Sequence, residues 1–97
     1  MMFAIALSAA LAASPDGPSF RFKLSGAPGS TVAVRDSAPS GWLPAFCTTR
    51  VCSIGHVIVK LPKSGIATVD LHMHNVAGGA HGTANVSAGG ASVAVPI

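Results

Sequence analysis

From residue 19 onward, apolar and polar residues alternate along the chain with a period of two. This is the side-chain repeat of a β-strand that buries one face. The segment FRFKL at residues 20–24, for example, has three apolar residues separated by two basic ones. No segment has the 3.6-residue period of an amphipathic helix. The pattern predicts strands at residues 20–24, 31–36, 56–61, 66–75, 82–88 and 91–95.

Glycine, proline and serine separate these segments and predict the turns between them. Residues 88–91, AGGA, contain the two glycines that suit a tight hairpin turn. The other turn segments are residues 26–29, 37–41, 62–65 and 76–79. Short strands joined at such spacings are typical of antiparallel sandwiches. We therefore expect an all-β fold, a small antiparallel sandwich of six to seven strands, over residues 19–97.

The apolar side of the alternation defines the expected core. Trp42, the only tryptophan of the chain, should pack at the rim of this core. The residues expected to be mostly buried are Phe20, Phe22, Val32, Val34, Val57, Val59, Leu61, Val69, Leu71, Met73, Val86 and Val93.

The N-terminal segment differs from the rest of the chain. Residues 1–13 are almost wholly apolar and are followed by the turn-forming segment SPDGPS. The segment is too short to span a bilayer, which needs about 20 residues, but it fits the apolar core of a secretory signal with cleavage after Ala12 or Ala13. It departs from that pattern because no Lys or Arg precedes Arg21. We expect residues 1–13 to be a signal peptide; a first β-strand or a short buried helix is the alternative.

Composition narrows the function further. The chain has 97 residues, 9% of them charged, with no glutamate and no tyrosine. The three aspartates, Asp16, Asp36 and Asp70, lie far apart in sequence, so few groups could perform acid–base catalysis, and we do not expect an enzyme. The net charge is +3, but the six basic residues form no run and are hardly interleaved with aromatic residues. A nucleic-acid partner is therefore not expected.

Cys47 and Cys52 lie in the segment GWLPAFCTTRVCSIGH, residues 41–56. In an exported protein two cysteines this close are most simply a disulfide, because the compartment is oxidising and a small core benefits from a crosslink. A redox pair usually has the spacing C-x-x-C at the start of a helix, whereas this spacing is C-x4-C between strands. A blue-copper site using Cys52 and His56 would need a second histidine and usually a methionine, and residues 57–60 contain neither.

Several short motifs follow one another in order: PSGW at residues 39–42, FC at 46–47, Cys52, and AHGT at 80–83 before a final hairpin. This order resembles the small immunoglobulin-like modules that are appended to many bacterial secreted and surface proteins. In those modules a Pro-Gly-Trp turn often precedes a strand, and an Ala-Gly-Thr turn opens the next-to-last strand. The resemblance covers residues 19–97. It implies an immunoglobulin-like β-sandwich with an accessory or adhesive role and without catalysis.

The histidines offer one further chemical possibility. Asp70, His72 and His74 share one side of a predicted strand, and His81 follows a glycine-rich turn. Alternate residues of a strand lie about 6.6 Å apart, so two imidazoles could converge on one metal ion with a third ligand from His81 or Asp70. The same alternation places these side chains on the polar face, where they need no ligand. Copper or zinc is therefore an alternative cofactor, and no cofactor is the first expectation.

The sequence thus predicts an exported, non-catalytic β-sandwich with a structural or protein-contact role in the cell envelope or outside the cell. Its location would be periplasmic or extracellular, with no membrane span after removal of the signal. Its partner would be a protein or another envelope component that the sequence does not identify. The alternative is a small periplasmic metal-binding protein that uses the histidine pair.

Overall fold

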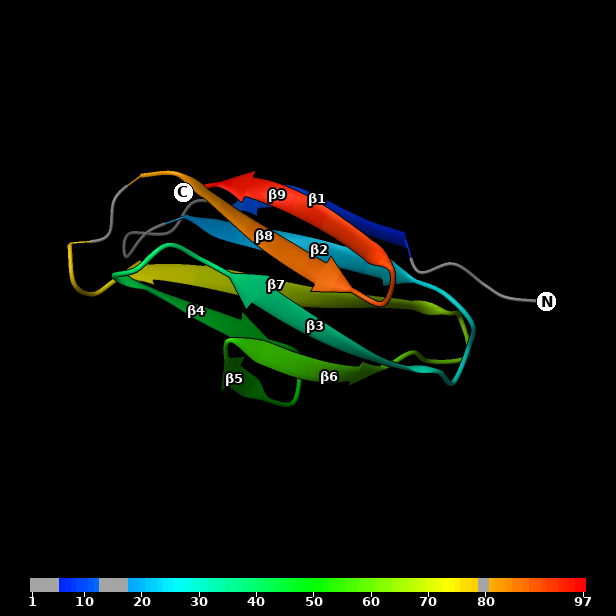
Figure 1. The fold of residues 1–97 in the computed structure, drawn as a ribbon. Coiled ribbons are helices and arrows are strands. Elements are labelled where there is room, and N and C mark those ends of the chain that lie inside the picture. Colours follow the sequence, from blue (N-terminus) through cyan, green and yellow to red (C-terminus); the bar gives the residue numbers. More distant parts are fainter. Residues whose placement is uncertain (1–5, 13–17, 79–80) are drawn as a thin grey trace.

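The computed structural model describes residues 6–12, 18–78 and 81–97, and these residues form nine β-strands and no helix (Figure 1). The strands pair only in antiparallel fashion. They are β1 (Ala6–Ala12), β2 (Ser19–Ser25), β3 (Thr31–Ser37), β4 (Trp42–Cys47), β5 (Cys52–Ile54), β6 (His56–Lys60), β7 (Ile66–Asn75), β8 (Thr83–Ala88) and β9 (Ala91–Pro96).

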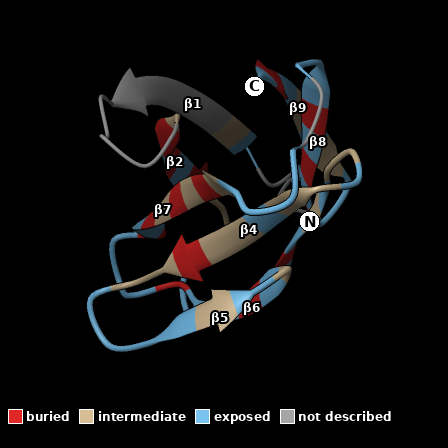
Figure 2. Ribbon diagram, turned by 90° about the vertical axis from the view of Figure 1, so that its left-hand side faces the viewer, coloured by how far each residue is buried: buried red, intermediate tan, exposed pale blue. Residues whose placement is uncertain are grey.

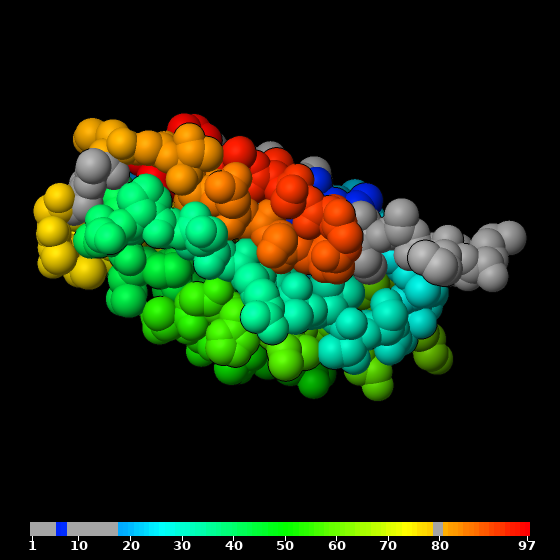
Figure 3. Space-filling model, viewed as in Figure 1, coloured from blue at the N-terminus to red at the C-terminus, as the bar shows by residue number. Residues whose placement is uncertain are grey.

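These strands form two sheets that pack face to face. One sheet has the order β1-β2-β7-β4-β5 and the other the order β6-β3-β8-β9. Strands β3, β8 and β9 make up the front of the molecule in Figure 3, with β6 along the lower border of this face. The predicted all-β antiparallel sandwich is confirmed.

The described residues contain three strands beyond the six segments that the alternation predicted. One is β4, which contains Pro44 and fully buries only Phe46, and another is β5, which has only three residues. Neither can show a clear period of two. The third is β1, which lies in the predicted signal segment and pairs along its whole length with β2. Signal cleavage remains a prediction, and the other residues of that segment, 1–5 and 13, lie outside the described residues.

The core lies between the sheets and consists largely of the residues expected from the pattern. All twelve predicted core residues are buried except Val93, which is half-buried and packs against the core. Figure 2 shows this alternation as red bands along β7. Trp42 packs at the margin of the core, as predicted, and Phe46 is a further fully buried aromatic residue.

The chain changes sheets at Gly55, between β5 and β6. The Gly55 N–H donates to the carbonyl of Pro44 in the five-stranded sheet at 2.9 Å, and the Gly55 carbonyl accepts from the N–H of Asp36 in the four-stranded sheet at 3.1 Å. Its φ of 82° is a left-handed conformation that glycine adopts without the steric cost of a side chain. Gly55 is therefore a corner that joins the two sheets along one edge of the sandwich.

A second glycine controls the connection between β6 and β7. Gly65 is buried with a φ of 72°, and its carbonyl accepts a hydrogen bond from the N–H of Gly26 at 2.9 Å. A Cβ atom at this position would lie 2.5 Å from the carbonyl oxygen of Gly26. Any larger residue would therefore force the two loops apart.

Candidate functional site

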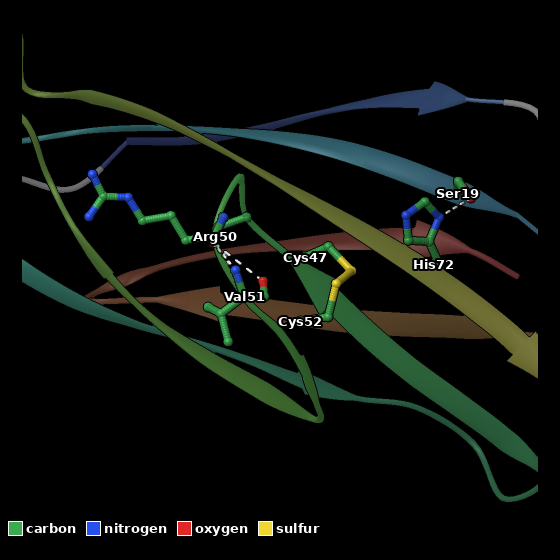
Figure 4. The surroundings of a disulfide bond; sticks show 7 residues. Ser19, Cys47, Arg50, Val51, Cys52 and His72 are labelled. Atoms are coloured by element: carbon green, nitrogen blue, oxygen red, sulfur yellow. Dashed lines mark hydrogen bonds between the residues drawn. A yellow bond between two sulfur atoms is a disulfide. The ribbon is translucent and has the colours of Figure 1, made fainter.

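A disulfide joins the first residue pair of the β4–β5 hairpin (Figure 4). Cys47 ends β4 and Cys52 begins β5, with their Cα atoms 4.1 Å apart. The turn between them closes when the Thr48 N–H donates to the carbonyl of Val51 at 2.8 Å. Thr48 Oγ1 also accepts hydrogen bonds from the N–H groups of Arg50 and Val51, each at 3.2 Å. The predicted Cys47–Cys52 pairing is confirmed, and it fixes a short hairpin at the edge of the sheet.

Asp70 lies on the outer face of β7, next to β2. The Arg21 Nε–H donates to Asp70 Oδ1 at 2.9 Å, and the pair is well exposed. This hydrogen bond, followed by the attraction between the two charges, raises the pKa of Arg21 above its ordinary value. The Asp70 carboxylate is therefore engaged in an ion pair with the Arg21 guanidinium.

His72 lies two residues further along the same face and contacts Ser19 of β2. The Ser19 Oγ and His72 Nδ1 atoms are 2.8 Å apart (Figure 4). A serine hydroxyl beside an imidazole is the pairing used in covalent catalysis, which also needs a nucleophile that substrate can reach. Ser19 is only 4% exposed, and the nearby acid Asp70 binds Arg21. The contact stabilises the pairing of β2 with β7.

The predicted metal ligands are distributed over both sheets. His74 lies on β7 opposite Leu43 of β4, whereas His81 is exposed in the segment that precedes β8 of the other sheet. In the parts of the chain that the structure describes, no three His, Cys, Asp or Glu side chains are grouped to hold a metal ion. Zinc sites in proteins usually have three or four protein ligands. Of the four candidates, the structure places Asp70, His72 and His74 on one face but does not bring them together as a metal centre.

Asp36 is a titratable residue that the sequence analysis did not single out. It is half-buried near the end of β3, on the same side as the core residues Val32 and Val34. Among the described residues its two carboxylate oxygens are buried and have no hydrogen-bond partner. Burial raises the pKa of Asp36 from 3.8 to about 6. The sequence TVAVRD contained this information. Its period of two places Val32, Val34 and Asp36 on the same side of the strand, which is the core side.

A notch in the five-stranded sheet opens where the β4–β5 hairpin ends. The pairing of β4 with β7 stops at Cys47 and Asp70, so residues 66–69 have no strand partner on that side of β7 among the residues that the structure describes. A groove of about 900 Å³ occupies this position, between the notch and strand β6. We call it the edge groove; it is lined by residues 48–51, 58–63 and 66–68, with Pro28 and Gly29.

The edge groove presents unusually exposed aliphatic side chains. Val51, Ile58 and Ile66 all line it, and they are 51%, 63% and 44% exposed. They come from the hairpin turn, β6 and β7, so three separate segments contribute to one apolar surface. Figure 2 shows β5 and β6 together at one margin of the sandwich, with exposed segments in pale blue. Gathered apolar side chains of this kind are typical of binding surfaces.

Among the described residues, the charged side chains that line the edge groove are all positive. They are Arg50, Lys60 and Lys63, three of the six Lys and Arg residues of the chain. In the sequence these basic residues are scattered. The fold brings them together because the hairpin turn, the end of β6 and the β6–β7 loop meet at the same edge. An apolar groove with a basic rim can bind an apolar segment that carries negative charge.

Comparison with known protein families gives no matching family model, and comparison with curated proteins gives no match either. The described residues include no helix long and apolar enough to cross a membrane. The edge groove is thus characterised by its own geometry and charge.

Proposed function

We propose that the protein is an exported, non-catalytic β-sandwich that acts by binding another protein in the cell envelope or outside the cell. The edge groove carries this proposal, because it combines exposed aliphatic side chains with a rim to which the described residues contribute only basic charges. The Cys47–Cys52 disulfide supports an oxidising compartment, where such bonds persist. The apolar segment at residues 1–13 supports export.

The order of the strands supports an immunoglobulin-like assignment within this proposal. Immunoglobulin domains have the sheet orders A-B-E-D and C-F-G. Within residues 19–97, strands β2-β7-β4 and β3-β8-β9 follow the orders B-E-D and C-F-G, with β6 added beside β3. Strand β1 holds the A position, but it lies in the segment that signal cleavage would remove. One feature differs. Strand β4 takes the D position, and β6 lies beside the strand in the C position. Along the chain β4 comes before β6, so these two strands follow each other in the reverse of the immunoglobulin order.

The export part of the proposal is tested by producing the full chain in a bacterial host and fractionating the cells. We expect the protein outside the cytoplasm, as a chain that begins after Ala12 or Ala13. Its mass should be two hydrogens lower than that of the same chain in reduced form. A Cys47→Ser/Cys52→Ser variant should be exported equally but lose the mass difference on reduction, which separates export from oxidation. Retention in the cytoplasm as a chain beginning at Met1 with two free thiols would contradict the proposal.

The protein-contact part is tested with a photo-crosslinking amino acid placed at Ile58 in the groove. Val76 is a matched control, because it is 64% exposed against 63% for Ile58 but does not line the groove. We expect irradiation of intact cells to give a discrete adduct, identified by mass spectrometry, from position 58 and not from position 76. Equal labelling at both positions, or no adduct at either, would argue against a partner at the groove.

A further inference from the structure

The backbone of β6 presents hydrogen-bonding groups along an open edge. In the four-stranded sheet β6 is the first strand, and within the described parts of the chain it pairs with β3 alone. The carbonyl of Gly55 accepts from Asp36, and the N–H of Leu61 donates to Ser30, so the odd-numbered residues of this stretch turn their backbone groups toward β3. In an antiparallel pair the intervening residues turn theirs away. The N–H and C=O groups of His56, Ile58 and Lys60 therefore face the free edge.

The side chains of β6 alternate between the core and the outer face, and this alternation indicates which residues an added strand would need. Val57 and Val59 point into the core, whereas Ile58 and Lys60 are exposed on the outer face. A strand added to β6 would direct every second side chain toward the apolar edge groove and the others outward beside Lys60. Opposite charges on neighbouring strands attract. The inward residues should thus be apolar and the outward ones acidic.

We infer that the edge groove binds an extended peptide segment with alternating apolar and acidic residues, which pairs with β6 as a further antiparallel or parallel strand. Main-chain hydrogen bonds to His56, Ile58 and Lys60 supply the pairing, and the groove receives the apolar side chains. Arg50, Lys60 and Lys63 select negative charge in the partner. This inference rests on the proposed protein-contact function and names the chemistry of the partner.

Charge also argues against a second copy of the chain as the occupant. Two β6 edges that paired with each other would bring the basic rims of both copies to the same interface. The part of the lining that the structure describes contains no carboxylate that could neutralise them. Like charges placed together at an interface oppose association. An acidic peptide removes this repulsion, so the observations favour it over self-association.

The test uses the full oxidised chain and three capped nine-residue peptides at pH 7.5. The first alternates valine with glutamate, the second alternates valine with lysine, and the third has the composition of the first but with its valines and glutamates grouped. Calorimetric titration should show that the first peptide binds at least about tenfold more tightly than either of the others, since each opposite-charge pair across strands contributes up to about fivefold. Hydrogen exchange by NMR should slow at the amides of His56, Ile58 and Lys60.

Two variants separate backbone pairing from side-chain contact. Ile58→Pro removes an N–H that faces the open edge without removing a bond to β3, and proline is tolerated on such edges. It should weaken binding of the alternating acidic peptide by more than about tenfold, whereas Ile58→Ala, which keeps the amide, should weaken it by at most about fivefold. The same peptide with N-methylated amides tests the pairing without changing the protein, and it should also bind more than about tenfold more weakly.

Several results would overturn the inference. The first is equal affinity for the acidic and basic alternating peptides, and the second is unchanged binding after N-methylation. The third is a dimer in sedimentation experiments that Ile58→Pro dissociates, because a second copy of the chain would then occupy the edge of β6. Crosslinking from Ile58 in cells together with failure of all three peptides would reject the peptide chemistry alone. A cytoplasmic, reduced protein whose oxidised form still binds the acidic peptide would reject the export proposal and leave the peptide inference standing.

Discussion

Replacing Asp36 with asparagine should stabilise the protein at neutral and alkaline pH. Burial raises the folded-state pKa of Asp36 to about 6 against an ordinary value of 3.8. The folded state therefore holds the Asp36 proton more tightly than the unfolded chain, and stability falls as the pH rises from about 3.8 through about 6, above which the loss is complete. A difference of about two pH units corresponds to about 3 kcal/mol at most, and the partial exposure of Asp36 reduces this to about 1–2 kcal/mol.

Asparagine has nearly the same shape as aspartate and cannot ionise. We therefore expect Asp36→Asn to be more stable than the parent by about 1–2 kcal/mol at pH 8, with the difference shrinking toward zero below about pH 4. Urea unfolding of the oxidised protein, followed by the fluorescence of Trp42 between pH 3.5 and 8, measures both curves. The single tryptophan suits this assay because it packs against the core.

The matched control is Asp70→Asn, which makes the same chemical change on the outer face. Its ion pair with Arg21 is exposed and contributes little, so this variant should be only slightly less stable than the parent at pH 8. If Asp36→Asn had the stability of the parent at pH 8, or were destabilised equally at every pH, the burial argument for Asp36 would be refuted.

The other stability predictions concern the crosslink, a glycine and the core. The double change Cys47→Ser/Cys52→Ser should lower the free energy of unfolding by about 2 kcal/mol, the loop-entropy estimate for so short a ring, and a loss below 0.5 kcal/mol in urea unfolding would contradict it. Gly65→Ala should cost at least about 2 kcal/mol, since a left-handed residue alone costs about 1–2 kcal/mol and the added Cβ meets the Gly26 carbonyl. Gly90→Ala, with nothing within 4 Å and no left-handed φ, should be nearly neutral by the same assay, and equal costs at both sites would disprove the steric argument. Leu71→Ala should cost about 2–5 kcal/mol because Leu71 is fully buried, and a melting temperature close to that of the parent would show that this side chain does not pack as described.

The alternating pattern predicted the strands whose two faces differ in polarity. In residues 66–75 the core side chains Val69, Leu71 and Met73 were found from sequence because β7 lies in the middle of a sheet with one face against the core. Strand β4 escaped prediction because Pro44 and a single fully buried residue, Phe46, leave no period to detect. The disulfide was predictable because its two cysteines are close in sequence.

The candidate site was largely beyond prediction from the sequence. The edge groove depends on where β4 stops pairing with β7, and a single sequence contains no signal for the length of a strand pair. Its basic rim combines Arg50 with Lys60 and Lys63, which the fold alone brings to one edge. The predicted strand at residues 31–36 contained Asp36, but only its apolar residues Val32 and Val34 were expected on the core side, because a carboxylate is rarely buried.

The corner at Gly55 ties the two sheets together through backbone hydrogen bonds at a single residue. Its amide hydrogen belongs to one sheet and its carbonyl oxygen to the other, so the hairpin and β6 cannot detach independently without breaking a bond at the same residue. Amide exchange at Gly55 and Asp36 should consequently report one shared opening event, with similar free energies and similar responses to denaturant. A ligand that added a strand to β6 would slow amide exchange at Gly55 as well. Binding to the four-stranded sheet would therefore also slow amide exchange in the five-stranded sheet.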